Sequence, residues 1–264
     1  AMKAIEAANE ICPDHPDLII LKSRYLSLNG KLEEAKSLLD QLIIRETDDL
    51  YAHYYRANLQ LRLGNYEEAY KDYKRAIEIK PDFIDALFSI GKCSISLGKY
   101  EDAIEYLEKL RDMLQYNREV RVLVGCAYQF QVEKLEACVK EKSDDIDLKI
   151  KLAEAYLASN KIEESYGILS QLEQSSDMNN KSYLLYCKVL LAMDKKELAY
   201  TAVNKALEIY PKDYDLIVYK ACILDEFERY EESLQFYDLA IEKKNDDALT
   251  HNNRAYALNK LERH

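Results

Sequence analysis

The chain has 264 residues and a formal net charge of −11, which counts against a surface built to bind the phosphates of nucleic acid or of an anionic membrane. Hydrophobic residues make up 48% and charged residues 32% of the chain, a composition that excludes a disordered protein. Only 6 Gly and 4 Pro are present, too few turn residues for a sheet-rich fold, so we expect an all-α protein.

Apolar residues recur at helical spacing along the whole chain, with a period of 34 residues. In chain order, the predicted elements are a lone helix over 3–13, helix pairs over 16–49, 50–83 and 84–117, a short unit over 118–145, helix pairs over 146–179, 180–213 and 214–247, and a lone helix over 248–264. Gly64-Asn65 and Gly98-Lys99 interrupt the helical pattern within their segments. Each complete segment is therefore predicted to be an antiparallel helix pair.

Three segments, 50–83, 84–117 and 214–247, share small or aromatic residues at fixed positions, counted from the first residue of each segment. The eighth is small (Ala57, Gly91, Ala221), the seventeenth is Tyr (Tyr66, Tyr100, Tyr230) and the twentieth is Ala or Ser (Ala69, Ala103, Ser233). This pattern resembles the tetratricopeptide repeat (TPR), and the resemblance covers essentially the whole chain. It implies a right-handed α-solenoid, a single array over 1–264 whose first helices line a concave groove.

The repeat over 118–145 is short and degenerate, with 28 residues and no Gly or Pro in the stretch 130–134 where its turn is expected. Its second helix, from about 135 to 142, is therefore either stunted or fused with the first. The short repeat is a tolerated deletion in one interpretation, and a hinge or docking notch in the other.

Both ends of the array lack the polar face that normally caps a terminal repeat. The helix over 3–13 is predicted to be the second helix of a cut repeat, and the helix over 248–264 the first helix of another. We therefore expect this chain to be an excised piece of a longer array. Apolar surface over 4–11 and 255–261 makes end-to-end self-association of the cut repeats a further expectation.

Residues that carry chemistry form no recognisable site. The histidines at 15, 53, 251 and 264 lie in unrelated repeats, and the chain has no metalloprotease, nucleophile or phosphate-loop motif. The six cysteines are at least 12 residues apart and form no CxxC, so we expect reduced thiols used as small core residues. We predict no enzymatic activity, no cofactor and no metal.

The first helices of the predicted pairs offer a candidate partner-binding surface. At the fifth position of each first helix, seven of eight residues are apolar, and the residues four and seven positions further on share that face. The predicted groove residues are Ile20, Arg24, Tyr51, Tyr54, Asn58, Leu61, Arg62, Phe88, Lys92, Ile95, Val122, Ile150, Leu184, Lys188 and Val218. Two interpretations stay open, because these side chains either bind a partner or pack between adjacent first helices.

Two known uses of the TPR family do not match. In some members, Lys and Asn on successive first helices hold a C-terminal carboxylate of the major cytosolic chaperones, but here Asn58 fits one place while Tyr54 takes that of its Lys partner. A ladder of Asn, as in a sugar transferase of the family, is also absent, since the corresponding positions hold residues such as Leu21, Tyr55 and Ser89.

The resemblance favours a non-enzymatic scaffold that binds a protein or peptide segment, as a subunit or adaptor of a larger assembly. A co-chaperone of the J-domain type, which shields apolar segments of its clients, is the first alternative. The regulatory arm of an enzyme whose catalytic domain lies outside this segment is the second. Neither nucleic acid nor membrane is an expected partner, although exposed aromatic residues could stack bases. We expect a cytoplasmic location, with the nucleus as the alternative.

Overall fold

The structure is a computed structural model that describes residues 7, 10–12 and 14–261. The described residues form fourteen α-helices and no strand, so the prediction of an all-α fold is confirmed. Most residues of the predicted helix over 3–13 and of the apolar surface over 4–11 lie outside the described residues. No helix in the described part is long and apolar enough to cross a membrane.

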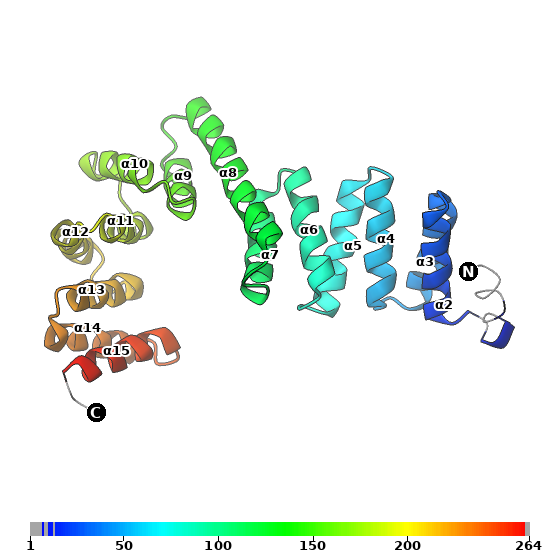
Figure 1. The fold of residues 1–264 in the computed structure, drawn as a ribbon. Coiled ribbons are helices and arrows are strands. Elements are labelled where there is room, and N and C mark those ends of the chain that lie inside the picture. The colour runs from blue at the N-terminus through cyan, green and yellow to red at the C-terminus, as the bar shows by residue number, and fades with distance from the viewer. Residues whose placement is uncertain (1–6, 8–9, 13, 262–264) are drawn as a thin grey trace. The chain divides into compact units, whose positions relative to one another are not determined.

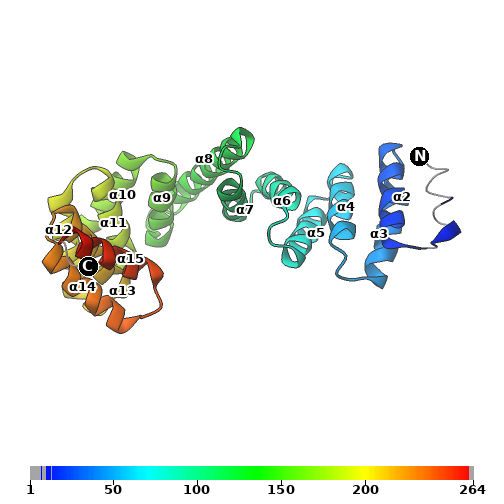
Figure 2. The ribbon, with the colours of Figure 1, turned by 60° about the horizontal axis from the view of Figure 1, so that its bottom comes forward.

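The chain divides into two compact units, residues 1–131 and 132–264, which we call the N-terminal and C-terminal units. Helices of the N-terminal unit are α2 (Pro16–Leu28), α3 (Leu32–Arg45), α4 (Leu50–Arg62), α5 (Tyr66–Ile79), α6 (Ile84–Ser96), α7 (Tyr100–Met113) and the first part of α8 (Arg118–Glu141). Those of the C-terminal unit are the rest of α8, α9 (Ile146–Ala158), α10 (Ile162–Gln174), α11 (Asn180–Ala192), α12 (Lys196–Ile209), α13 (Tyr214–Glu226), α14 (Tyr230–Lys243) and α15 (Ala248–Lys260). Within each unit, consecutive helices pack side by side in chain order (Figures 1 and 2).

The turn inside each helix pair depends on one backbone conformation. The fifteenth position of the repeat has a positive φ in every complete pair, at Gly30 (79°), Gly64 (82°), Gly98 (67°), Asn160 (59°), Asp194 (55°) and Glu228 (58°). At Gly64, the next amide, that of Asn65, donates to the carbonyl of Gln60 over 2.8 Å, which satisfies a carbonyl at the end of α4. A residue that adopts the left-handed conformation therefore ends each first helix.

The short repeat forms one continuous helix of 24 residues, α8, rather than a helix pair. Its fifteenth position is Val132, and a β-branched residue is costly in the left-handed conformation. Val132 is instead fully buried, in a cluster with Leu135, Leu152 and Ala155. Of the two predicted outcomes, a stunted second helix or fusion of the two helices, the structure shows fusion.

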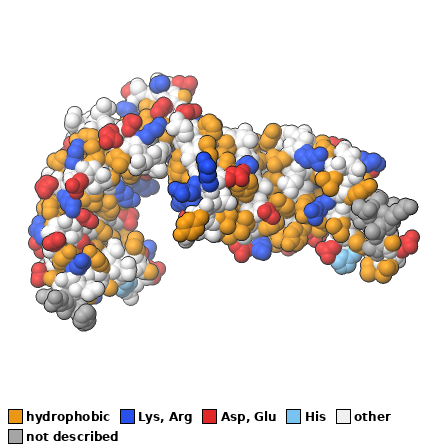
Figure 3. All heavy atoms as spheres, viewed as in Figure 1, with side chains coloured by type: hydrophobic (Ala, Val, Ile, Leu, Met, Phe, Trp, Pro, Cys, Tyr) orange, Lys and Arg blue, Asp and Glu red, His pale blue; other side chains and the backbone are white. Residues whose placement is uncertain are grey.

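Small residues allow the two helices of each pair to approach closely. Ala57 and Ala69, at the eighth and twentieth positions, are fully buried between α4 and α5. At the eighth position of the next pair, a Cβ on Gly91 would lie 2.5 Å from the Cδ2 atom of Leu107, so any larger residue there would require the Leu107 side chain to shift. The buried clusters extend across successive helix pairs, while apolar and charged side chains are intermingled over the visible surface (Figure 3).

Candidate functional site

The fifth-position side chains of the first helices differ in exposure. In the N-terminal unit, Tyr54 and Phe88 are half-buried and Val122 is 56% exposed, but Ile20 is buried in a cluster with Leu26 and other residues. In the C-terminal unit, Leu184 and Val218 are half-buried and Ile150 is buried. Ile20 and Ile150 therefore belong to the core, where a partner does not reach them.

An aromatic cluster positions the exposed face of α4. The ring of Tyr54 lies 5.0 Å from that of Phe83 and 5.9 Å from that of Tyr73, both centroid to centroid. Tyr51 contacts Phe83 edge to face and is 49% exposed. Tyr51, Tyr54 and Phe83 keep part of their surface in contact with solvent, whereas Tyr73 is fully buried. The packed rings therefore form a firm apolar surface on α4.

Two lysines among the predicted groove residues differ in whether a carboxylate pairs with them. Lys92 lies 4.4 Å from the ring centroid of Phe88 and pairs with Glu119 at 3.3 Å, so its charge is already balanced. Lys188 is exposed, and no carboxylate among the described residues pairs with it. The half-buried Leu61 and Ile95 pack against the core of the N-terminal unit.

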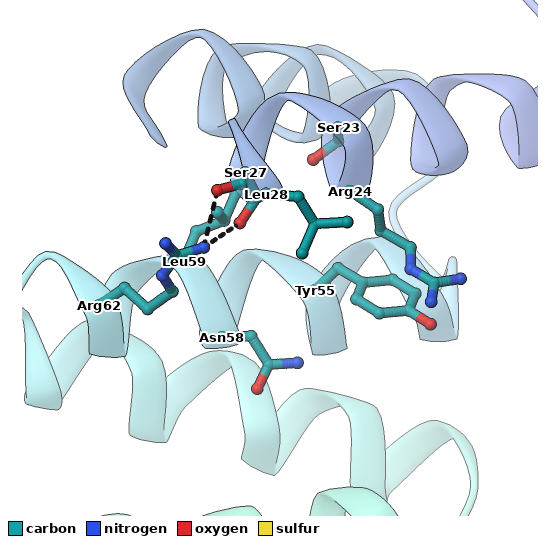
Figure 4. Close-up of a pocket in the computed structure, with 8 residues that line it drawn as sticks. All are labelled: Ser23, Arg24, Ser27, Leu28, Tyr55, Asn58, Leu59 and Arg62. Carbon is teal, nitrogen blue, oxygen red and sulfur yellow. Dashed lines mark hydrogen bonds between the residues drawn. The ribbon is translucent and has the colours of Figure 1, made fainter. Parts of the chain in front are cut away.

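A pocket of about 260 Å³ opens between α2 and α4 in the N-terminal unit (Figure 4). Its lining includes Arg24, Ser27 and Leu28 from α2, and Tyr55, Leu59 and Arg62 from α4. Sequence reasoning placed Arg24, Asn58 and Arg62 on the partner-binding face, and the structure brings all three to this pocket. It missed Leu28, Tyr55 and Leu59, because a repeat pattern on single helices does not show what lies between two helices.

Asn58 is only partly available at the pocket. Its side-chain carbonyl accepts a hydrogen bond of 2.6 Å from the hydroxyl of Tyr73, which holds the amide in place. The Tyr73 hydroxyl is buried, and burial raises the pKa of Tyr73 well above its usual value. The hydroxyl therefore stays protonated and keeps donating to Asn58 at physiological pH.

A polar network between α4 and α5 was not predicted from the sequence. The Asp72 carboxylate accepts hydrogen bonds from the Arg56 guanidinium, at 2.6 and 2.7 Å, and from His53 Nδ1, at 3.0 Å. Burial by itself raises the pKa of Asp72, but the hydrogen bonds from Arg56 and His53 outweigh it and the pKa is lowered. The sequence did contain one indication, because His53 and His251 both occupy the fourth position of their repeats. In the structure, Nε2 of each histidine contacts the main-chain carbonyl six residues earlier.

The C-terminal unit has a different polar arrangement beside α13. The Tyr237 hydroxyl donates to Oδ2 of Asp225 over 2.7 Å, while Oδ1 of Asp225 is buried without a hydrogen-bond partner. Burial raises the pKa of Asp225. The raised pKa follows from desolvation and does not identify a ligand.

The cysteines and other metal-binding side chains form no cluster. Cys93 and Cys187 are buried, and burial raises the pKa of their thiols to about 11 and about 12. The expectation of small core cysteines describes these two, whereas Cys12 and Cys126 are exposed. No group of three or more His, Cys, Asp or Glu in the described residues could hold a metal ion.

Comparisons with known proteins find repeat proteins. Residues 29–110 match the family model described as "Anaphase-promoting complex, cyclosome, subunit 3". The chain is 22% identical over 291 residues to the TPR repeat-containing protein YpiA of Bacillus subtilis (strain 168), covering 91% of this chain and 66% of YpiA. It is 25% identical over 189 residues to the DnaJ homolog subfamily C member 3 homolog of Dictyostelium discoideum, covering 71% and 35%. The chain thus spans less than two thirds of either relative.

Among solved structures, the chain is similar to a tetratricopeptide repeat protein from Parabacteroides merdae, with a TM-score of 0.44, 21% identity, and coverage of 84% of this chain and 90% of that one. For the APC/C hetero-tetramer Cut9–Hcn1, the TM-score is 0.46 at 12% identity, with coverage of 96% and 51%. The recurring helix pairs, the family model and the repeat-containing relative show that this chain is a tetratricopeptide repeat protein.

Proposed function

We propose that this chain is a protein-interaction scaffold, and that the first helices of its repeats bind a polypeptide segment of a partner. The observation that carries the proposal is the set of accessible apolar side chains at the fifth position of α4, α6 and α8, namely Tyr54, Phe88 and Val122. They recur with the repeat, so they present one apolar side chain per repeat to a partner. TPR folds are typically non-enzymatic interaction scaffolds, which supports the proposal.

The spacing of the repeat defines the form of the partner segment. Neighbouring packed helices lie roughly 10 Å apart. An extended peptide advances about 10 Å in three residues, and an α-helix does so in about seven. The partner segment therefore carries an apolar anchor at every third residue if it is extended, or at every seventh if it is helical.

The proposal is tested with peptides selected on the intact chain from a displayed random library. The tightest peptide is titrated by calorimetry against Phe88→Asp plus Val122→Asp. A buried anchor contributes about 2 kcal/mol or more, so the affinity is expected to fall by at least about 30-fold. Ile44→Asp is the matched control, because Ile44 is 81% exposed on the second helix α3. Unchanged affinity in a folded double variant contradicts the proposal.

A role within a larger assembly is part of the same proposal. The match of residues 29–110 to a subunit family of the anaphase-promoting complex supports it. Size-exclusion chromatography of the tagged chain from its source cells tests it, since a scaffold subunit elutes at a mass well above the 30.8 kDa of the chain.

Two relatives favour a second candidate function, binding of unfolded clients. One is the DnaJ homolog described above, and the other is the SGT1 homolog of Oryza sativa subsp. japonica, 31% identical over 126 residues that cover 47% of this chain and 34% of that relative. A client-binding chain is expected to suppress aggregation of several unrelated denatured proteins. A scaffold with a defined partner segment is expected to leave their aggregation unchanged.

A further inference from the structure

The pocket between α2 and α4 contains an unbalanced positive charge in an acidic protein. The chain has a net charge of −11, and most of its described arginines pair with carboxylates. The paired ones are Arg45, Arg56, Arg75, Arg111, Arg229 and Arg254. Arg24 and Arg62 of the pocket pair with no carboxylate among the described residues, although acidic side chains outnumber basic ones.

Neutral contacts hold both guanidinium groups in place. Arg24 lies over the ring of Tyr55, 4.9 Å from its centroid. Arg62 donates from one terminal nitrogen to the main-chain carbonyl of Ser27, at 2.9 Å, and to the Ser27 hydroxyl. A guanidinium has five N–H donors, so both groups keep donors for a further acceptor. Their positions at opposite ends of the pocket are visible in Figure 4.

The middle of the pocket is apolar and exposed. Leu28, the last residue of α2, is 84% exposed and lies between the two arginines in Figure 4. Leu59 contributes further apolar lining from α4. A volume of about 260 Å³ is below the usual range of small-molecule pockets, roughly 300–1,000 Å³, but leaves room for a side chain.

We propose that this pocket binds an acidic segment of a partner polypeptide, in which one apolar side chain covers Leu28 and an Asp or Glu on each side of it pairs with Arg24 or Arg62. The planar guanidinium fork matches a carboxylate with two parallel hydrogen bonds, and stacking on Tyr55 leaves the edge of Arg24 open for this contact. Two separated cations call for two carboxylates, which a single C-terminal carboxylate does not supply, and the proposal assigns both to acidic side chains of an internal segment. The inference rests on the proposed function and names the chemistry of its partner.

The test uses peptide selection on the intact chain, with random 12-residue peptides joined to the phage coat protein through their C-terminus, so that only side-chain carboxylates are offered. Wild type is expected to enrich peptides with an apolar residue between two acidic ones. Arg24→Glu plus Arg62→Glu is expected to lose this preference and to favour Lys and Arg. An enriched peptide, synthesised with blocked ends, is expected to bind the variant about tenfold more weakly.

Arg118→Glu plus Arg121→Glu is the matched control, because both arginines are exposed on α8 in the same unit and the change in net charge is identical. This control is expected to enrich the same acidic peptides as wild type, and circular dichroism verifies that each variant folds. If peptides are enriched without any acidic preference, or if both double variants behave alike, the inference is overturned while the proposed function stands. If no peptide is enriched on the wild-type chain, both are overturned.

Discussion

Asp72 shows how single residues of this protein combine packing with charge. Its side chain is only 8% exposed, and its carboxylate contacts both Arg56 and His53. Nε2 of His53 lies 2.9 Å from the carbonyl of Thr47, while Nδ1 of the same ring lies 3.0 Å from the Asp72 carboxylate. The carboxylate thereby links α5 to α4 and to the loop before it. Loss of the Asp72 charge would leave Arg56 with Asp40 as its remaining carboxylate partner, and removal of one member of a buried ion pair is costly.

We expect Asp72→Asn to lower the free energy of unfolding by about 3 kcal/mol at pH 7. The pKa of Asp72 is lowered in the folded state, so its contribution is fully present above the unfolded value of about 3.9 and is lost as the pH falls through the folded value. The difference between wild type and variant should therefore shrink at pH 3. Urea denaturation at both pH values measures it.

Asp48→Asn is the control for this measurement. Asp48 pairs with Arg75 in the same unit but is 69% exposed, so its removal should cost less than about 1 kcal/mol. A loss of stability at Asp48 equal to that at Asp72 would contradict the argument that burial makes the Asp72 network important.

The candidate site was only partly predictable at the residue scale. Position in the repeat gives the direction in which a side chain points around its helix, and Tyr54, Phe88 and Val122 are accessible. The same rule fails for Ile20 and Ile150, which are 6% and 7% exposed. Burial depends on what the neighbouring helix places over a side chain, and a one-dimensional pattern does not contain that information.

At the scale of helices, the turns between paired helices could be located from the sequence in two ways. Gly30, Gly64 and Gly98 mark three turns directly, because glycine adopts a positive φ without steric cost. Asn160, Asp194 and Glu228 occupy the same position with the same conformation, so the 34-residue period finds these turns where composition does not. The sequence left fusion within α8 as one of two alternatives. Val132 argues against a turn only once its position in the repeat is known to require the left-handed conformation.

Replacement of Glu228 by glycine is expected to stabilise the C-terminal unit by about 1 kcal/mol, since a non-glycine residue with φ of 58° is disfavoured by about that amount. Asn160→Gly is the matched variant, and a smaller gain is expected because Asn tolerates this conformation. Thermal unfolding followed by circular dichroism compares the two. Equal gains, or a loss at Glu228, would show that backbone strain is not the dominant effect at this position.

At the scale of the whole molecule, contacts between helices are short in range along the chain. The packed helix pairs are neighbours or next neighbours in sequence, such as α4 with α5 and α2 with α4 (Figure 1). In a repeat array of this kind, stability is approximately a sum of the stability of each repeat and of its interfaces with adjacent repeats. A local defect should therefore have a local effect.

Leu39 and Leu190 allow this locality to be measured, because each is fully buried, one on α3 in the N-terminal unit and one on α11 in the C-terminal unit. Truncation of either to alanine removes the same atoms and is expected to cost about 3 kcal/mol. Hydrogen exchange followed by mass spectrometry on the intact chain should show faster exchange in α2–α5 for Leu39→Ala and in α10–α13 for Leu190→Ala. Faster exchange across both units in either variant would instead mean that all the repeats unfold as one cooperative body.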